Sequence, residues 1–435
     1  LHVNANKQFG MAENEDIYFQ SMEARNSAYN KMPDIVNDKM EEINKIMGTN
    51  YKPFNYYGKD DATNVIVAMG SVCDTIKLVI DKLNKEGHKL GLVEVHLYRP
   101  FSKKYLENVL PKSVNNIAVL DMTKESGSVG EPLYLDVLAT LGNKYNIVGG
   151  RYGLSSKNTT PDDVASVYKM LENELKNNFT IGIIDDVTNL SLSKVELNLK
   201  ENDKSLKIYG FGSDGMVSTS KDLLKLVNKK LGYYVQGYFE YDSKKSGGVT
   251  VSNLRFSDQP INKPYYVTKS LITVVTKFEY FYKYEMLDSL DEGGTLLIST
   301  DLNEEEIKKE LPSKVKNIIL DKKLNVLFID ADELALKHNL KGKISKIMEM
   351  VILHLMDLDD AKNELIESIK NQFKTKGEEI INNNIAVVNE AIDNIKVLKI
   401  DFNKEEVKDN NEDDIFSKIM ARKGNLLTVK DCLAI

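Results

Sequence analysis

The residues whose types and spacing most clearly suggest chemistry are three glycines near the middle of the chain. Gly210, Gly212 and Gly215 follow a short apolar run at G-x-G-x-x-G spacing and precede a helical pattern. Such glycines allow a tight turn and close backbone approach, and amides at the start of the next helix point toward an anion. We therefore predict that these glycines and Ser213 cradle a phosphate group. The spacing alone leaves a second interpretation open, in which the glycines only let a strand and a helix pack closely.

Two lysines after the next predicted strand indicate the kind of phosphate ligand. In NAD-binding domains, an acidic residue about 20 positions after the glycines accepts the ribose hydroxyls. Here Lys244 and Lys245 follow the strand end, and two ammonium groups suit an adenosine with an additional phosphate, as in coenzyme A and NADP. We predict that Arg255 offers a planar fork to another phosphate oxygen. The alternatives are a solvated loop for the lysines and a surface salt bridge between Arg255 and Asp258.

One acidic residue stands inside the glycine motif. The negative charge of Asp214 would repel a phosphate in the turn. We therefore predict that its side chain caps the following helix.

The glycine motif opens the second of two regions in which apolar runs alternate with helical patterns, as in α/β proteins. After a helical pattern that ends near residue 47, the first region predicts strands at residues 65–69, 90–97, 117–120 and 145–148, with helices at 72–83, 105–110, 130–141 and 161–175. Ser102 and Thr160 are predicted to cap helices. The second region predicts strands at 206–209, 233–239, 249–256, 271–275, 295–299, 317–320 and 326–329, with helices at 217–231, 344–358, 360–373 and 378–395.

These patterns predict an α/β chain with two largely parallel sheets. We expect a connecting helical segment at 1–58, a first domain at 59–192 and a second domain at 193–400 that is Rossmann-like and ends in helices. Residues 401–435 are predicted to form an acidic, solvated linker into a further domain.

Charged residues are predicted at the carboxyl edge of the first sheet. This is the edge at which parallel sheets present ligands. Arg99, Lys124, Glu125 and Glu131 follow strand ends there. We prefer structural or interdomain roles for them over direct chemistry.

Composition limits the classes of partner. The 435 residues carry 58 basic and 65 acidic side chains, for a net charge of −7, without a sustained basic block. This balance argues against nucleic acid or an anionic membrane as the main partner. Neither an apolar run of about 18 residues nor a secretory pattern is present. We expect an intracellular, cytoplasmic chain that binds small molecules or proteins.

Cysteines and histidines predict neither a metal site nor a catalytic group. Cys73 and Cys432 are far apart and lie in no CxxC pattern, which excludes a disulfide framework or a four-thiolate iron–sulfur site built from this chain. We interpret Cys73 as a small buried hydrophobe, the alternative being a thiol with a lowered pKa near a helix start. The five histidines show no triad or metal-ligand spacing.

Several longer blocks resemble the pyruvate:ferredoxin (flavodoxin) oxidoreductase family and the related pyruvate:NADP oxidoreductases. They are VIVAMGSVCDTI (65–76), LYRPFS (97–102), DMTKESGSVGEPLYLD (121–136), VGGRYGLSSK (148–157) and YFEYDSKKSGGVTVSNLRF (238–256). The resemblance covers nearly the whole chain. It implies an internal part of a longer polypeptide, with a transketolase-C-terminal-like second domain followed by a gamma-type third domain.

The resemblance also implies a reaction. Enzymes of this family decarboxylate pyruvate oxidatively on thiamine diphosphate with Mg, pass electrons through 4Fe-4S clusters and transfer the acetyl group to coenzyme A. Thiamine diphosphate and the clusters would lie in the missing domains, which are the chain's expected partners within a homodimer. The third domain would supply the coenzyme A site. The chain alone is expected to be inactive, and no residue is assigned a catalytic role.

Two functions of other classes stay open at this point. The chain could be a free-standing NADP-binding dehydrogenase, whose signature would be hydride transfer. It could also be an assembly module that binds no ligand.

Overall fold

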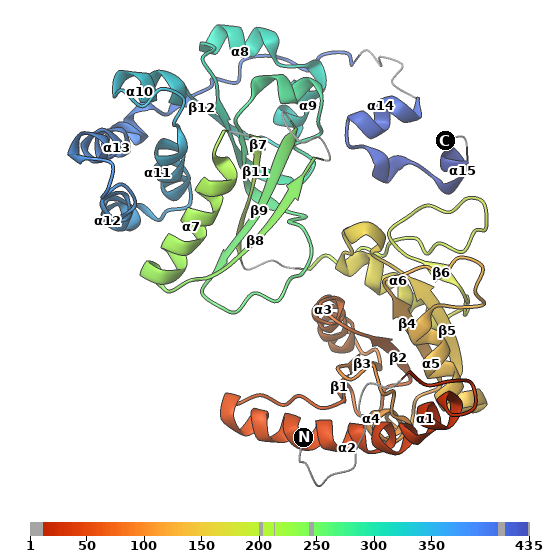
Figure 1. The fold of residues 1–435 in the computed structure, drawn as a ribbon. Coiled ribbons are helices and arrows are strands. Elements are labelled where there is room, and N and C mark those ends of the chain that lie inside the picture. The colour runs from red at the N-terminus through yellow and green to blue at the C-terminus, as the bar shows by residue number, and fades with distance from the viewer. Residues whose placement is uncertain (1–11, 200–202, 213, 243–247, 408–413, 434–435) are drawn as a thin grey trace, which may run out of the picture. The chain divides into compact units, whose positions relative to one another are not determined.

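The computed structural model describes residues 12–199, 203–212, 214–242, 248–407 and 414–433. The chain divides into two compact units, Leu1–Asn198 and Leu199–Ile435. Each unit contains one sheet with helices on both faces (Figure 1). Within the described ranges, no helix combines the length and the apolar character that crossing a bilayer requires.

The first unit contains a six-stranded sheet in the order β1-β3-β2-β4-β5-β6. Its strands are β1 (Phe54–Gly58), β2 (Asn64–Ala68), β3 (Leu90–Val95), β4 (Asn116–Asp121), β5 (Asn146–Arg151) and β6 (Phe179–Thr180). Only the pairing of β1 with β3 is antiparallel. Every residue of β2 is buried, as expected for a parallel strand that helices cover on both sides.

Six helices accompany this sheet. They are α1 (Tyr18–Ala24), α2 (Asn26–Met47), α3 (Val72–Lys85), α4 (Lys103–Val109), α5 (Pro132–Leu141) and α6 (Pro161–Glu172). The predicted cap of α6 is confirmed: Asp163 N donates to Thr160 Oγ1 at 3.3 Å, and Thr160 N donates to Asp163 Oδ2 at 2.9 Å. The hydroxyl and the carboxylate thus satisfy each other's backbone amides at the helix start. Ser102 precedes α4 but makes no side-chain capping bond.

The second unit contains a seven-stranded sheet in the order β13-β12-β11-β10-β7-β9-β8. Its strands are β7 (Lys204–Phe211), β8 (Tyr234–Tyr241), β9 (Val249–Ser257), β10 (Ser270–Val275), β11 (Leu290–Ser299), β12 (Asn325–Ile329) and β13 (Lys396–Val397). Strands β7, β10, β11 and β12 are parallel. The mostly parallel α/β class predicted for both units is therefore confirmed.

The second unit departs from a regular Rossmann order at β9. This strand lies between β7 and β8 and runs antiparallel to both. The element that follows β7 and α7 is therefore not the direct neighbour of β7. The hairpin between β8 and β9 instead returns the chain to the edge of β7.

Helices cover both faces of the second sheet. The helices of this unit are α7 (Met216–Leu231), α8 (Glu304–Glu310), α9 (Ser313–Asp321), α10 (Ala331–Lys337), α11 (Ser345–Leu355), α12 (Lys362–Gln372), α13 (Glu378–Glu390), α14 (Ile415–Met420) and α15 (Val429–Cys432). Leu297 of β11 packs with α7 and α11, whereas its neighbours Leu296 and Ile298 pack with α8 and α9. Alternate residues of a strand point to opposite faces, so this sheet is a middle layer between two helical layers.

One sequence prediction in this unit is wrong. Residues 317–320 were predicted as a strand but lie in α9, because a four-residue apolar run does not by itself distinguish a strand from one face of a helix. The segment after Asp401, predicted to be a solvated linker, is exposed from Asn403 to Val407, but Phe402 packs against the core and Lys316 Nζ donates to Glu405 Oε1 at 2.6 Å. This segment therefore forms part of the unit's surface layer at least as far as Glu405.

Candidate functional site

The glycine motif forms the turn between β7 and α7 at the carboxyl edge of the second sheet. A Cβ atom added to Gly210 would lie 2.9 Å from Met216 Cβ, so this glycine lets the strand and the helix pack closely. Gly215 has a φ of 83° and precedes the first residue of α7, a conformation that other residues rarely adopt. Both glycines are thus required by the turn itself.

The inside of this turn is occupied by the side chain of Asp214. Its Oδ2 accepts hydrogen bonds from Phe211 N at 2.6 Å and from Thr276 Oγ1 at 2.7 Å, and its Oδ1 accepts one from Met216 N at 2.9 Å. Met216 is the first residue of α7, so Asp214 binds an amide at the helix start, although the N-cap residue is Gly215 rather than Asp214. The carboxylate also ties the turn to the end of β10.

The end of β8 and the start of β9 lie beside the glycine turn. Tyr241 of β8 is paired with Thr250 of β9, and Thr250 is paired with Gly210. Gly212 N donates to Gly248 O at 3.1 Å. The backbone therefore leaves and re-enters the sheet next to the turn.

Three of the predicted phosphate-binding residues lie outside the described residues. They are Ser213, Lys244 and Lys245. Their predicted roles stay proposals, supported by the position of the described residues on either side of them.

The prediction that Arg255 binds a ligand phosphate is wrong. Its side chain is 1% exposed, and its guanidinium donates to Gln236 Oε1 at 2.9 Å, Tyr265 O at 2.8 Å and Tyr266 O at 2.9 Å. Its Nε also lies 3.4 Å from Asp203 Oδ2. A buried guanidinium with these partners is a structural group, and the surface bridge to Asp258 is wrong for the same reason.

The strand register gives a second reason. Arg255 is paired with Ser205 at the amino end of β7, whereas the glycine turn lies at the carboxyl end. Five residues at about 3.4 Å each separate the two positions by about 17 Å. A signal was available in the sequence, because Arg255 stands between Leu254 and Phe256 in an apolar strand that is buried throughout.

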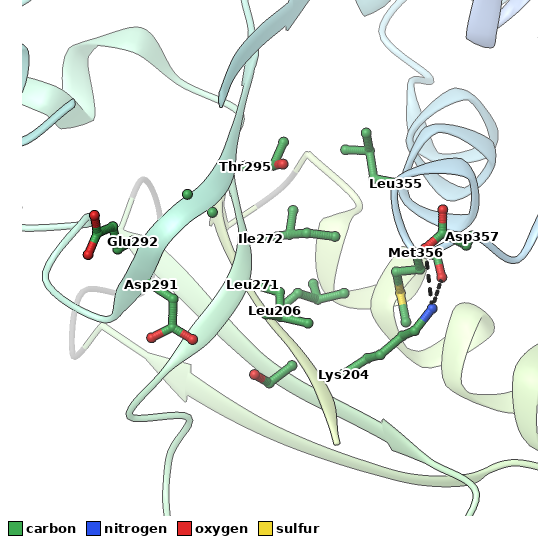
Figure 2. A pocket seen from close by; sticks show the side chains of 13 residues that line it. Lys204, Leu206, Leu271, Ile272, Asp291, Glu292, Thr295, Leu355, Met356 and Asp357 are labelled. Carbon is green, nitrogen blue, oxygen red and sulfur yellow. Dashed lines mark hydrogen bonds and ion pairs between the residues drawn. The ribbon is translucent and has the colours of Figure 1, made fainter. Parts of the chain in front are cut away.

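A small cavity opens at this amino edge of the sheet, but it does not suit a phosphate. Figure 2 shows Lys204 pointing toward Met356 and Asp357 at the end of α11. The ammonium group donates to Met356 O at 2.5 Å and lies 3.5 Å from Asp357 Oδ2. Its charge is thus used within the unit, and the remaining lining is mainly apolar or acidic: Leu206, Leu271, Ile272, Asp291, Glu292 and Leu355.

A larger cleft of about 440 Å³ lies on the carboxyl side, beside the glycine turn. Three helices begin at it, since its lining includes Gly215 before α7, Ser345 at the start of α11 and Glu379 in the first turn of α13. Helix starts carry partial positive charge and favour anions. Two basic residues, Lys343 and Lys376, line the cleft, as do the carboxylates of Asp214 and Glu379.

The other lining residues supply hydrogen-bonding and stacking groups. Lys376 Nζ lies 5.5 Å from the centre of the Phe373 ring. The amides of Asn339, Asn383 and Asn384 also line the cleft, although Asn384 Nδ2 donates to Ile380 O at 2.7 Å. No local sequence pattern marks this cleft, because its residues come from segments more than 120 positions apart along the chain.

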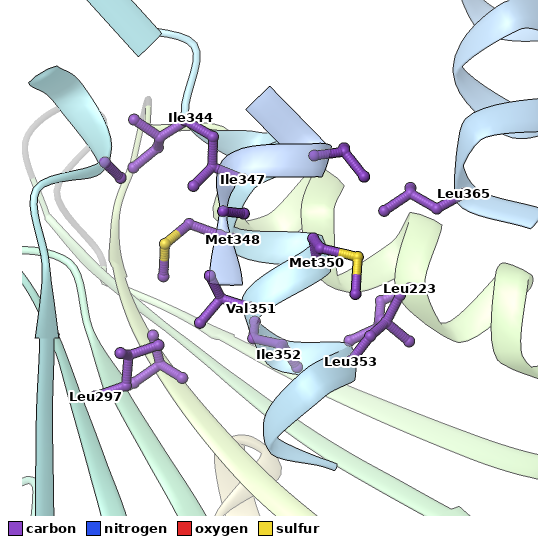
Figure 3. Packing of buried hydrophobic residues seen from close by; sticks show 14 of the residues in the cluster. Leu223, Leu297, Ile344, Ile347, Met348, Met350, Val351, Ile352, Leu353 and Leu365 are labelled. Atoms are coloured by element: carbon purple, nitrogen blue, oxygen red, sulfur yellow. The ribbon is translucent and has the colours of Figure 1, made fainter. Parts of the chain in front are cut away.

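The cleft is supported by the core around α11. Figure 3 shows the buried side chains of α11 together with those of its neighbours. Leu223 of α7, Leu365 of α12 and Leu297 of β11 belong to the same cluster. Ile347, Val351 and their neighbours are fully buried, which is typical of a helix with no solvent face. The position of Lys343 and Ser345 therefore depends on this packing.

One charged group interrupts this core. Lys346 and Glu349 have side chains that are each 2% exposed, and Lys346 Nζ lies 2.8 Å from Glu349 Oε1 and 3.6 Å from Asp222 Oδ2 of α7. Burial raises the pKa of Glu349 to about 7, although the nearby Lys346 lowers it. The pair links α11 to α7 just behind the cleft.

The carboxyl edge of the first sheet is closed by ion pairs. Arg99 Nη1 lies 2.7 Å from Asp136 Oδ2, and its guanidinium stacks on the Tyr98 ring at 3.9 Å. Glu131 Oε1 lies 3.2 Å from Arg151 Nη1, while its Oε2 accepts a hydrogen bond from Glu125 N at 2.6 Å. These contacts are structural, in agreement with the preferred interpretation of this edge.

Two further residues of the first unit are structural. The carboxylate of Asp121, a residue without a predicted role, accepts hydrogen bonds from Leu133 N and Tyr134 N, each at 3.0 Å, at the start of α5. Burial raises its pKa in spite of these two bonds. Burial also raises the pKa of the Cys73 thiol to about 12, so the interpretation of Cys73 as a small buried hydrophobe is confirmed.

In the described part of the chain, no group of three or more histidine, cysteine or acidic side chains is arranged to hold a metal ion.

Two family descriptions match this chain. Residues 205–394 match "Pyruvate ferredoxin/flavodoxin oxidoreductase", and residues 62–164 match "Pyruvate:ferredoxin oxidoreductase core domain II".

Curated relatives match along most of the chain. A pyruvate-flavodoxin oxidoreductase from Enterobacter agglomerans is 40% identical over 92% of this chain and 35% of its own length. A pyruvate:ferredoxin oxidoreductase from Moorella thermoacetica is 41% identical over 90% of this chain and 34% of its own length. A mitochondrial pyruvate dehydrogenase [NADP(+)] from Euglena gracilis is 38% identical over 87% of this chain and 22% of its own length. The chain thus spans about a third or less of the length of these relatives.

Solved structures give only remote similarity. A pyruvate oxidoreductase subunit from Thermotoga maritima is 18% identical, with a TM-score of 0.37, over 46% of this chain and 100% of that one. A 2-oxoglutarate:ferredoxin oxidoreductase from Magnetococcus marinus, solved with 2-oxoglutarate, coenzyme A and succinyl-CoA bound, is 16% identical, with a TM-score of 0.37, over 49% of this chain and 34% of that one.

Proposed function

Because the chain belongs to the pyruvate:ferredoxin/flavodoxin oxidoreductase family, we propose that it forms part of an enzyme that oxidises pyruvate. That enzyme converts pyruvate and coenzyme A into acetyl-CoA and CO2 and passes two electrons to ferredoxin, flavodoxin or NADP. The relatives that match over 87 to 92% of the chain carry names of this activity.

This chain's own residues do not fit the redox cofactors of such an enzyme. A 4Fe-4S cluster needs four cysteine thiolates, whereas the chain contains only Cys73 and Cys432, of which Cys73 is buried. We therefore assign thiamine diphosphate, Mg and the clusters to other domains of the same polypeptide. Two copies of that polypeptide would form a homodimeric enzyme.

The role of the second unit is to bind coenzyme A at the carboxyl edge of its sheet. The observation that carries this proposal is the hydrogen bond from Gly212 N to Gly248 O, because it fixes the end of the lysine-bearing hairpin beside the glycine turn. Lys244 and Lys245 would meet the additional phosphate of the adenosine. Gly210, Gly212, Ser213 and Gly215 would form the wall of the turn that faces the ligand.

The neighbouring cleft supports the same proposal. A diphosphate and a phosphate carry several negative charges, and the cleft combines the starts of α7, α11 and α13 with Lys343 and Lys376. Its asparagines offer donors and acceptors to an amide-rich pantetheine arm. The first unit then acts as a scaffold for the other domains, since its charged edge residues are paired within the unit.

Calorimetric titration with coenzyme A tests this function. We expect binding that weakens as salt increases, because the contacts to phosphate are ionic, and that falls at least tenfold in Lys244→Glu. Lys269→Glu is the matched control, because Lys269 is exposed at the opposite end of the sheet, next to the start of β10. Equal or tighter binding of NADP would favour a dehydrogenase, and no binding of either ligand would favour an assembly module.

A further inference from the structure

The carboxylate of Asp214 occupies the place in the glycine turn where a dinucleotide would put its diphosphate. Phosphate-binding turns of this type aim the amides between the glycines and at the helix start toward the ligand. Here the amide of Phe211, between Gly210 and Gly212, and the amide of Met216, the first of α7, both donate to Asp214. The chain thus supplies its own anion to the turn.

Two further contacts hold this carboxylate in place. Thr276 Oγ1 donates to Asp214 Oδ2 at 2.7 Å, and Thr276 N donates to Tyr209 O at 3.1 Å, so the threonine fastens the side chain to the end of β7. Asp214 Oδ2 also lies 3.1 Å from the point where a Cβ on Gly210 would be. The glycine therefore makes room for the protein's own carboxylate.

A diphosphate entering the turn would meet this negative charge at close range. It would also find two of the expected amide donors already used, so it would need to displace Asp214 from all three of its donors. Outside the turn, Lys343 and Lys376 line the adjacent cleft, as Glu379 and Asp214 itself do. The favourable position for a diphosphate is therefore in the cleft, on the lysine side of the turn.

We propose that Asp214 is a specificity-determining residue that fills the glycine turn, excludes diphosphates from it and directs the diphosphate of coenzyme A to the neighbouring lysine-lined cleft. This inference rests on the proposed coenzyme A function for the ligand that is directed. The exclusion itself does not depend on that function. This exclusion explains why the chain has the glycine spacing of a dinucleotide-binding fold and yet carries Asp214 inside the motif.

The test measures binding of inorganic pyrophosphate and of NADP to the full chain by calorimetry. We expect the unsubstituted chain to bind pyrophosphate weakly, and we expect affinity for pyrophosphate and NADP to rise at least tenfold in Asp214→Ala. Asp214→Asn should give a smaller rise, because its amide oxygen still accepts a backbone hydrogen bond but carries no charge. Asp242→Asn, which removes a carboxylate from the hairpin beside the turn, is the matched control and should change neither affinity.

The readouts separate this inference from the proposed function. Unchanged pyrophosphate and NADP affinity in folded Asp214→Asn, or an equal rise in Asp242→Asn, overturns the inference. If Asp214→Ala does not fold, as judged by circular dichroism, Asp214→Asn alone decides. Failure of the unsubstituted chain to bind coenzyme A overturns the proposed function, while a rise in pyrophosphate affinity in Asp214→Asn would still support the exclusion.

Discussion

At the carboxyl edge of each sheet, an aspartate accepts hydrogen bonds from backbone amides, but the residues around the two aspartates differ. In each unit an aspartate accepts two backbone amides at or next to a helix start, Asp121 at α5 and Asp214 at the glycine turn before α7. In the first unit the neighbouring arginines are paired with Asp136 and Glu131. Beside the second turn, within the described residues, Lys343 and Lys376 form no ion pair and line a cleft.

This difference separates a structural edge from a candidate binding edge. An anion position at a helix start is not by itself a ligand site, because the chain can fill it with its own carboxylate. What distinguishes the second edge is an open volume lined by lysines that form no ion pair within the described residues, beside the carboxylates of Asp214 and Glu379. The following experiments test that distinction.

The largest effect is expected from the buried ion pair behind the cleft, which has no counterpart at the first edge. Glu349→Ala should lower the free energy of unfolding of the second unit by about 3–5 kcal/mol, because it leaves the Lys346 ammonium buried without its main partner. Urea unfolding followed by hydrogen exchange in both units checks this. The double variant Lys346→Met, Glu349→Leu should recover most of the loss, and an equal loss in the first unit would contradict the assignment.

The same pair makes the second unit sensitive to pH. Burial raises the pKa of Glu349 from 4.5 to about 7, so the folded chain binds a proton there more readily than the unfolded chain. The free energy of unfolding should therefore fall as pH rises from about 4.5 to about 7. Glu349→Gln should flatten this dependence, because the amide at this position does not titrate. A slope that is the same in the variant would assign the pH dependence to other groups.

Asp121 provides the test at the first edge. Asp121→Ala should lower the free energy of unfolding of the first unit by about 1–3 kcal/mol, because the buried amides of Leu133 and Tyr134 lose their acceptor. Coenzyme A affinity should stay unchanged. Hydrogen exchange of α5 and calorimetry measure the two quantities on one variant. A loss of coenzyme A affinity without a loss of stability would mean that the first edge is also a ligand site.

Much of this contrast could not be predicted from sequence, for reasons that differ between residues. Helix caps such as Thr160 and turn residues such as Gly215 are local, so the residues next to them in the chain define their roles. The structural role of Arg255 depends on the strand register and on backbone carbonyls about ten positions further along the chain. Lys343 and Lys376 approach the glycine turn only through the packing of α11 and α13, and no local pattern records that packing.

Asp214 shows how local and distant information combine. Its helix contact was predictable, because the acid stands next to the helix start. Its bond to Thr276 was not, because 62 positions separate the two residues. The predicted phosphate cradle and the observed internal acceptor use the same amides, and only the distant threonine explains why the carboxylate stays between them.

The smallest effect concerns the lysines of the cleft, and it tests the contrast most directly. Lys376→Glu should weaken coenzyme A binding about tenfold, or ~1.4 kcal/mol, because it reverses a charge beside the starts of three helices. Lys374→Glu makes the same charge change two residues earlier, at an exposed position outside the cleft lining, and should change affinity by less than twofold. Since both variants alter the net charge equally, a shared decrease would indicate general electrostatic attraction. A decrease confined to Lys376→Glu would locate the ligand in the cleft, whose lysine-lined open volume distinguishes the second edge from the first.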